Sequence, residues 1–493
     1  MDTESAWKKY DEAALAELER VCAGYVDFIS RNKTERECAA SALALAKEAG
    51  YVSLEQAFQE KRTLRPGDRV FAHAHGKAVI LVQLGTRPLQ EGMNILGAHI
   101  DSPRLDLKQN PLFEADGQVR LDTHYYGGIK HYQWVALPLA LHGVVAKKDG
   151  SVVNVVVGED PADPVFCVTD LLIHLASAQM DKKAREVVAG EDLDLLVGGR
   201  PLVIEADERA DAGASAWESA EGGAAGDAPS ADKEPAKAFV LSLLKERYGI
   251  EEADFLSAEL EVVPAGPARE LGFDRSMVLG YGQDDRVCAY TSLLAQLAVE
   301  APERTSVCVL VDKEEIGSVG ATGMASRFFE NAIATVMELA GESGELALRR
   351  ALSASAMLSS DVSAGFDPAY ASVFERKNAA FLGHGLVFNK YTGARGKSGS
   401  NDASAEYMAA IRHVMDEAGV AFQTAELGRV DAGGGGTIAY LPAQYGMNVI
   451  DSGVAVLSMH APWEVTNKAD IYEAYKGYVA FLRFAGFYGY FTS

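Results

Sequence analysis

Cysteine is scarce in this sequence. The 493 residues include five cysteines, and no two of them have CxxC spacing. Their odd number and scattered positions do not fit a disulfide framework. We therefore expect reduced and mostly buried thiols in a reducing compartment. The five residues are Cys22, Cys38, Cys167, Cys288 and Cys308.

Long apolar runs are also missing. The longest, residues 134–146, is shorter than the roughly 20 residues that a membrane-spanning helix requires, and it contains a proline and a histidine. Residues 1–20 are polar and lack the apolar segment of a signal peptide. We therefore expect a cytoplasmic protein with no membrane span.

Positive charge is in deficit. The chain has 46 Lys and Arg residues against 70 Asp and Glu residues, which gives a formal net charge of -24. Such a charge repels phosphate backbones and anionic lipid headgroups. Nucleic acids and membrane surfaces are therefore not expected as partners.

The signatures of two other protein classes are absent. The sequence has no GxSxG motif, which disfavours a serine hydrolase. The glycine-rich segments at 317–323 and 431–437 match neither GxGxxG nor GxxxxGK[ST], so they do not indicate nucleotide binding. We expect turns there, or at 431–437 a close approach of the backbone to a substrate.

The pattern of apolar residues near the N-terminus predicts helices followed by strands. Residues 8–31 place apolar side chains on one helical face. A second helix is expected to begin at Thr34, which has capping-box spacing to Glu37. The apolar runs at 78–84 and 93–101 are typical of strands.

The rest of the chain shows two different sequence patterns. Residues 103–270 carry alternating β-like stretches, whereas the chain after Gly272 repeats apolar strand and helix, as α/β folds do. We predict an α/β domain made of residues 1–102 and 271–493, interrupted by a mostly β insertion. Within the insertion, residues 207–238 contain no Val, Ile, Leu, Met or Phe. Such a segment cannot bury enough apolar area to offset ordering, so we expect a mobile acidic surface loop.

Candidate metal ligands stand where the strand-like runs end. Four separate apolar runs end in His, Asp or Glu, and the segment GQDDR, just ahead of a helical run, adds two carboxylates. In open α/β sheets, ligands bind outside the carboxyl ends of the strands. The residues so placed are His99, Asp101, Asp284, Asp285, Glu314, Glu315, Asp361 and His460.

This residue set suits a metal centre. Imidazoles and carboxylates together favour Zn²⁺ and also tolerate Co²⁺ or Mn²⁺. In an HxD pair, the Asp can accept the second ring N–H of the His and fix its tautomer. In a pair of adjacent glutamates, one can bind metal while the other remains free as a base. One Asp can bridge two metals roughly 3.5–4 Å apart. The set is therefore equipped for metal-assisted hydrolysis.

Five segments carry a resemblance to a known family. GAHIDSPRLDLK, GQDDRVCAY, VDKEEIGSVGATG, SSDVSAGFDP and SMHAPWEV resemble, in order and spacing, the motifs of the aspartyl aminopeptidase / aminopeptidase I family of two-zinc exopeptidases. The resemblance covers essentially the whole chain, and residues 390–403 favour the bacterial aminopeptidase I branch. It implies a zinc-peptidase-like α/β/α sandwich with an inserted dimerisation domain, assembled as a tetrahedral homododecamer. The implied substrates are peptides with free N-termini.

The resemblance also implies the ligands of a first zinc ion. His99 and Asp361 would bind this ion, and Asp101 would orient the imidazole of His99. Asp284, the first Asp of DDR, would bridge it to a second zinc ion.

The remaining roles concern the second zinc ion and the chemistry. Glu315 and His460 would complete this ion, and Glu314 would be the general base that deprotonates water. In the family, a His of the inserted domain reaches the active site of a neighbouring subunit. His174 is the matching position here, and the alternative is a helix residue that packs within the insertion.

Substrate choice differs among members of the family, some of which prefer acidic and others neutral N-terminal residues. Recognition of an acidic side chain needs a cation against its carboxylate. Lys390, Arg395 and Lys397 form a basic cluster on a Gly-rich loop, where they could line the pocket or remain solvated. We predict a preference for acidic or neutral N-terminal residues over basic ones.

Two other functions stay open at this point. A two-metal amidohydrolase or deacylase could use a similar centre on a non-peptide amide. A non-catalytic assembly protein could keep the fold without the chemistry, but the intact ligand set, and Glu314 in particular, argues against it.

Overall fold

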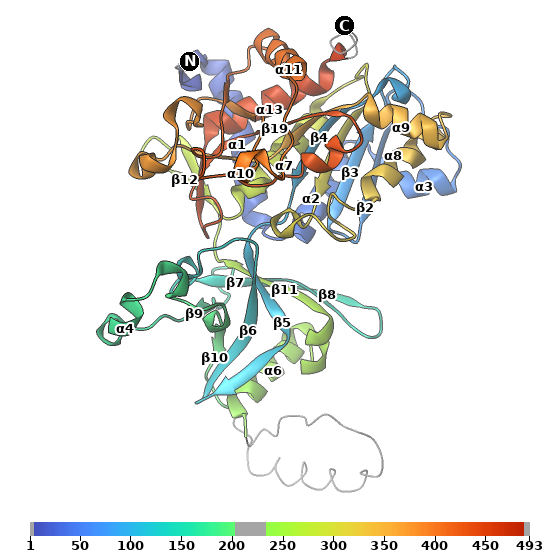
Figure 1. The fold of residues 1–493 in the computed structure, drawn as a ribbon. Helices are drawn as coiled ribbons and strands as arrows, with labels where there is room; N and C mark the ends of the chain where they lie inside the picture. The colour runs from blue at the N-terminus through green and yellow to red at the C-terminus, as the bar shows by residue number, and fades with distance from the viewer. Residues whose placement is uncertain (1–3, 203–232, 488–493) are drawn as a thin grey trace. The chain divides into compact units, whose positions relative to one another are not determined.

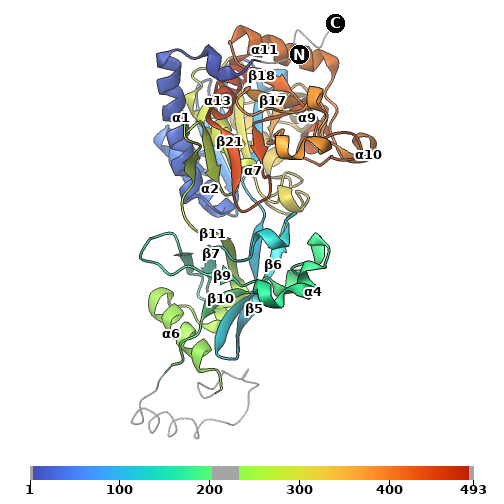
Figure 2. The same cartoon turned by 90° about the vertical axis from the view of Figure 1, so that its left-hand side faces the viewer.

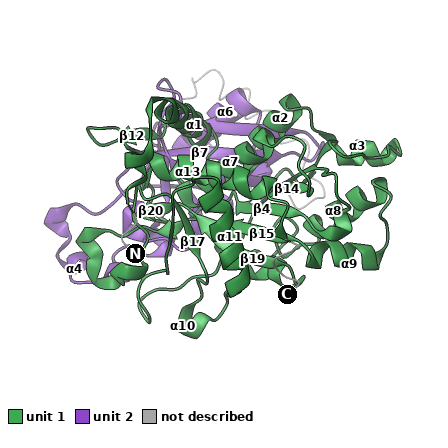
Figure 3. Ribbon diagram, turned by 90° about the horizontal axis from the view of Figure 1, so that it is seen from above, with its two compact units in different colours: residues 1–103, 267–493 green, residues 104–266 purple. Residues whose placement is uncertain are grey.

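The computed structural model describes residues 4–202 and 233–487 and divides into two compact units. Unit 1 comprises residues 1–103 and 267–493, and unit 2 comprises residues 104–266 (Figure 3). The main part of the predicted acidic loop, residues 207–232, lies outside the described residues.

Unit 1 is built around a nine-stranded sheet (Figure 1). Its strands β14, β4, β15 and β19 lie side by side and run parallel, so their carboxyl ends share one edge. The strands in spatial order are β1 (Val52–Ser53), β2 (Arg69–Ala74), β3 (Ala78–Gln83), β14 (Ser306–Val311), β4 (Asn94–His99), β15 (Ala356–Ser360), β19 (Asn448–Gly453), β17 (Leu386–Asn389) and β18 (Phe422–Thr424).

The central strands are buried on both faces. Alternate side chains of a strand point to opposite faces, and in β4 Leu96 joins one hydrophobic cluster while Ile95 joins another. In β14 the same division separates Cys308 from Val309. This explains why these strands read as continuous apolar runs in the sequence.

Helices cover both faces of the sheet, and the predicted α/β/α sandwich is confirmed. One layer consists of α1 (Glu12–Arg31), α2 (Glu35–Glu48), α7 (Gln283–Ala298), α11 (Ala405–Glu417) and α13 (Lys468–Arg483). The other consists of α3 (Leu54–Gln59), α8 (Phe328–Leu339), α9 (Glu345–Ser353) and α12 (Tyr440–Ala443).

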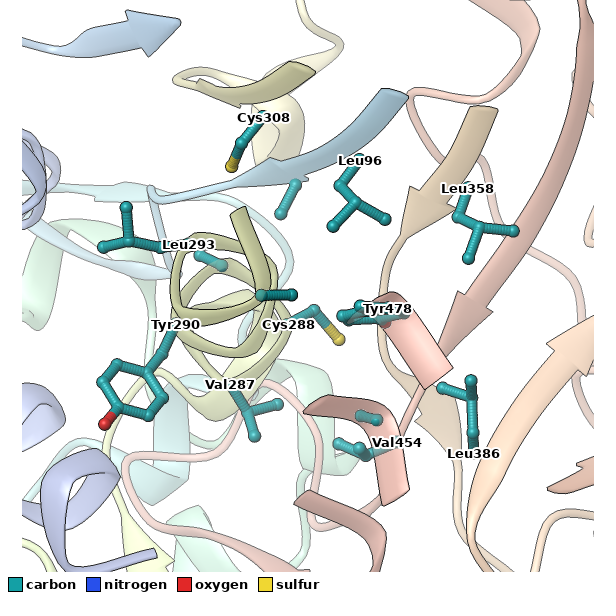
Figure 4. Close-up of a cluster of buried hydrophobic side chains, with 14 of the residues drawn as sticks. Leu96, Val287, Cys288, Tyr290, Leu293, Cys308, Leu358, Leu386, Val454 and Tyr478 are labelled. Carbon is teal, nitrogen blue, oxygen red and sulfur yellow. The ribbon is translucent and has the colours of Figure 1, made fainter. Parts of the chain in front are cut away.

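Helix α7 lies at the middle of the first layer. Its side chains Val287, Cys288 and Leu293 are buried, and they pack among side chains of the sheet and of α13, such as Leu96 and Tyr478 (Figure 4). This packing holds the first turn of α7 next to the carboxyl edge of β4.

The helix boundaries follow local capping chemistry. The predicted capping box of α2 is confirmed, because the Thr34 side chain accepts the N–H of Glu37 while the Glu37 side chain accepts the N–H of Thr34. Helix α1 begins at Glu12, a few residues after the predicted start, because Asp11 caps it through the N–H of Ala14.

A smaller five-stranded sheet also belongs to unit 1. Its strands β20 and β21 pair antiparallel and flank the loop that carries His460. In spatial order the strands are β12 (Arg269–Leu271), β13 (Met277–Gly280), β21 (Glu464–Asn467), β20 (Ala455–Leu457) and β16 (Ser363–Ala364).

Unit 2 is a seven-stranded antiparallel sheet with helix α6 (Pro235–Tyr248) packed against β5, β6 and β10 (Figure 2). The strands in spatial order are β8 (Val152–Val157), β7 (Leu139–Ala146), β11 (Ala258–Pro264), β5 (Arg104–Ala115), β6 (Gln118–Tyr126), β10 (Leu195–Gly198) and β9 (Cys167–Val168).

Helix α6 corrects one detail of the sequence analysis. The acidic loop was expected to extend to residue 238, but α6 already begins at Pro235. Proline is favoured in the first helical turn, and the Glu114 carboxylate accepts the N–H groups of Ala236 and Lys237, which have no partner within the helix. Within the described ranges, no helix is long and apolar enough to cross a bilayer.

Candidate metal centre

The carboxyl edge of the parallel strands gathers side chains that can bind metal. His99 is the last residue of β4, and Asp361 directly follows β15. Glu314 and Glu315 lie in a 3-10 turn, η8 (Glu314–Ile316), just after β14. Because these three strands are parallel neighbours, residues far apart in the sequence meet at one place.

The first turn of α7 adds Asp284 and Asp285. It follows Gly282, which has a φ of 70°. A Cβ atom at this position would lie 2.1 Å from Nη1 of Arg286, so glycine is required by both conformation and space. The guanidinium of Arg286 donates to the carbonyl oxygens of Ile100 and Lys33, which ties α7 to the chain that follows β4.

Asp284 lies between the two predicted histidine ligands. Its Oδ1 is 3.2 Å from Nε2 of His99, and its Oδ2 is 3.1 Å from Nε2 of His460. The same nitrogen of His460 is 3.4 Å from Oε1 of Glu315. The two oxygens of one carboxylate therefore face two different imidazoles, which is the arrangement that a bridging ligand needs.

Asp101 organises the opposite side of the centre. Its Oδ1 is 3.3 Å from Nδ1 of His99, and the backbone carbonyl of Asp101 is 3.0 Å from the same nitrogen. The carboxylate also accepts the N–H groups of Glu314 and Glu315, each at 3.2 Å. One buried side chain thus contacts the ring of His99 and the backbone of both glutamates.

The centre fits a divalent cation. Both side-chain oxygens of Asp285 and Oε1 of Glu315 are buried and, among the residues that the structure describes, have no hydrogen-bond partner. Buried carboxylates without partners are costly unless a cation compensates them. Two groups could each hold a metal ion: His99 with Asp284 and Glu315, and His99 with Asp285 and Asp361.

Burial and mutual repulsion control the charges in the centre. Burial raises the pKa of Glu314 to about 7, and it raises the pKa values of Glu315, Asp361 and Asp285 well above their usual range. Burial also acts on Asp284, but the two neighbouring imidazoles outweigh it and lower the pKa of that carboxyl. Asp284 is therefore the carboxylate best suited to remain charged before a metal binds.

Sequence reasoning missed one residue next to this centre. Glu464, the first residue of β21, is 1% exposed, and its carboxylate accepts the backbone N–H groups of Asp284 and His460. Burial raises the pKa of Glu464 to about 8, and the two N–H donors limit this rise because they favour the charged carboxylate. Its position four residues after His460 in the SMHAPWEV segment was the available indication.

The other predicted site residues belong to neither of the two groups that could hold a metal ion. His174 is exposed in unit 2, in the 3-10 turn η4 (Ile173–Leu175). The side chains of Lys390 and Lys397 both form ion pairs with Asp402. Arg395 is exposed on the short helix α10 (Ala394–Lys397).

Comparisons with known proteins identify the family of this chain. A family model described as aminopeptidase I zinc metalloprotease (M18) matches residues 28–482. A Clostridium acetobutylicum protein named "Probable M18 family aminopeptidase 1" is 54% identical over 476 residues, which is 97% of each chain.

Solved structures show the same fold. An M18 family aminopeptidase from Thermotoga maritima matches with a TM-score of 0.88 and 41% identity, covering 98% of this chain and 99% of that one. At 20% identity the likeness concerns the fold alone: the mApe1 dodecamer of S. cerevesiae matches with a TM-score of 0.74, covering 96% of this chain and 99% of that chain. The resemblance found in the motifs is thus confirmed, and the chain belongs to the aminopeptidase I (M18) family of zinc metalloproteases.

Proposed function

We propose that this zinc aminopeptidase uses two zinc ions to cleave the N-terminal peptide bond of peptides. His99 and Asp361 would hold one ion, Glu315 and His460 would hold the other, and Asp284 would be shared by both. The observation that carries the proposal is Asp284, whose two oxygens each face a different imidazole at 3.1–3.2 Å. Cobalt or manganese could replace zinc in such a mixed N/O site.

The chain's own residues divide the work of hydrolysis. Zinc in sites of this type acidifies water and polarises a carbonyl oxygen. Glu314 lies next to Glu315 in the turn that follows β14. We assign to it the role of general base, which takes the proton of the attacking water and passes it to the leaving amine. Asp101 keeps the His99 ring in position through its contact with Nδ1.

We extend the proposal to the assembly. His174 lies between Ile173 and Leu175, whose side chains are 67% and 69% exposed. Large apolar side chains in one exposed segment favour contact with a partner surface. We infer that unit 2 forms a dimerisation surface, that the chain assembles as a tetrahedral homododecamer, and that His174 completes the active site of a neighbouring subunit. The dodecamer described for a protein of the same fold supports this inference.

The proposed location is the cytoplasm. All five cysteines are free thiols, and four of them are buried. Free thiols are typical of proteins in a reducing compartment.

We propose that acidic or neutral N-terminal residues are preferred over basic ones. The basic loop that carries Lys390, Arg395 and Lys397 supports a role for these residues in contacting an acidic side chain. Lys390 and Lys397 share Asp402 as an ion-pair partner, which partly neutralises their charge. Arg395 is therefore the strongest of the three candidates.

The division of labour between the two glutamates gives a direct test of the function. We expect Glu314→Gln to retain zinc and to lower turnover of a dipeptide by about 10²–10⁴-fold, the usual contribution of a general base. The matched variant Glu315→Gln should lose one zinc ion. Turnover and zinc content of both variants decide the question: loss of zinc from Glu314→Gln, with retention in Glu315→Gln, would reverse the two roles.

The shared active site predicts complementation between subunits. His174→Ala alone should lower turnover by about 10²–10³-fold, as removal of one transition-state hydrogen-bond donor does. Co-expression of His174→Ala with His99→Ala should recover part of the activity, because each mixed site can combine an intact metal centre with an intact His174.

A second mixture controls this experiment. Co-expression of His99→Ala with Glu314→Gln should recover nothing. His99 and Glu314 belong to the same centre, so every subunit in the mixture carries a damaged centre that no neighbouring subunit can repair. Mixed oligomers of His174→Ala and His99→Ala that stay inactive, or a fully active monomer in sedimentation, would contradict the shared site.

The substrate preference can be measured with a panel of aminoacyl chromogenic substrates. We expect higher kcat/KM for Asp, Glu or neutral residues than for Lys or Arg. If acidic residues are preferred, Arg395→Ala should reduce that preference more than Lys390→Ala or Lys397→Ala. Arg349→Ala, an exposed arginine paired with Glu345, serves as the control. A clear preference for Lys or Arg substrates is the result that would overturn this proposal.

A further inference from the structure

We propose that Glu464 is a positioning residue that holds Asp284 and His460 at the spacing needed to share a metal ion. The inference rests on the proposed two-zinc function, because it concerns two of the ligands named there. Glu464 itself acts through the backbone of these ligands.

The contact geometry carries the proposal. Oε2 of Glu464 accepts the N–H of Asp284 at 3.1 Å, and Oε1 accepts the N–H of His460 at 2.7 Å. The two residues joined in this way are those whose side chains approach to 3.1 Å. A single buried carboxylate therefore links the backbones of two ligands that come from distant parts of the chain.

Neither ligand has regular backbone geometry at this place. His460 has a φ of 65°, in the left-handed region, which is strained for a residue with a side chain. Asp284 has a φ of -80° and a ψ of 105°, which is not helical although it lies in the first turn of α7. The carboxylate of Glu464 supplies acceptors for both N–H groups and stabilises this backbone arrangement.

Glu464 is itself held in place. It begins β21, where it pairs with Gly280 of β13. Its backbone carbonyl accepts the side-chain N–H of Gln283 at 2.6 Å, and the Gln283 side-chain oxygen accepts the hydroxyl of Tyr25 at 3.2 Å. The support thus extends from the metal ligands through β21 to helix α1.

Only a carboxylate meets both N–H groups with an acceptor. A glutamine at the same position would place an NH₂ donor against one of them and leave it without a partner. Asp470 offers a matched comparison, because its buried carboxylate accepts the N–H groups of Gly383 and Gly385 at 2.8 and 2.7 Å. Those two glycines belong to a different loop from the proposed ligands.

The test measures zinc affinity, with zinc alone titrated into demetallated protein in the presence of a competing chromogenic chelator. We expect Glu464→Gln to weaken binding of one of the two ions by about 10–100-fold, as loss of a residue that orients a ligand does. Asp470→Asn should lower the unfolding temperature and leave both zinc affinities within about twofold of wild type, since it removes a similar backbone contact away from the ligands.

The outcomes are distinct. Unchanged zinc affinities in Glu464→Gln, or equal losses in Glu464→Gln and Asp470→Asn, would overturn the proposal. If Glu464→Gln folds in low yield, Glu464→Asp carries the same comparison, because it keeps the carboxylate but withdraws it by one methylene group. A wild-type chain that binds fewer than two zinc ions would instead contradict the two-zinc function, and a single bound ion would then serve for the Glu464 comparison.

Discussion

The cost of removing several carboxylates from water and placing them close together is the constraint on which this centre depends. Five carboxylates lie together at the carboxyl edge of the sheet, of which Asp284 and Asp285 are buried and Glu314, Glu315 and Asp361 are partly buried, and burial raises the pKa of four of them. Two imidazoles offset part of this cost by lowering the pKa of the fifth, Asp284. The remaining cost is what bound cations relieve. Metal binding and the stability of this edge are therefore two consequences of the same electrostatic arrangement.

A rigid scaffold is needed to keep such groups close before a cation arrives. Parallel strands bring His99, Glu315 and Asp361 to one edge, and buried helix α7 delivers Asp284. Two buried carboxylates then hold the backbone of the proposed site residues. Asp101 accepts the N–H groups of Glu314 and Glu315, and Glu464 does the same for Asp284 and His460. Support of this kind resembles the outer contacts that orient ligands in metal sites generally.

The sequence predicted the parts of the structure that depend on local pattern. Continuous apolar runs indicated the buried strands, Thr34 and Glu37 indicated a capping box, and the charged residues at strand ends indicated the cluster of imidazoles and carboxylates that could hold metal. Glu464 was missed because it acts through backbone N–H groups, which depend on tertiary structure, and its place four residues after His460 does not by itself reveal that role. The pairing of Lys390 with Asp402 escaped for the same reason, since it depends on how one loop folds back on itself.

The start of α6 shows another limit of sequence reasoning. Composition alone extended the acidic loop to residue 238, but Glu114 on β5 accepts the free N–H groups of the first turn and allows the helix to begin at Pro235. A cap supplied from another element cannot be read from the helix's own sequence.

The central claim is that two metal ions share Asp284. Diffraction data collected on both sides of the zinc absorption edge, from crystals of the zinc-loaded protein, test it most directly. The account predicts two anomalous peaks about 3.5–4 Å apart, one beside His99 and Asp361 and the other beside Glu315 and His460, with Asp284 between them. A single peak, or two peaks that do not share Asp284, would contradict the account.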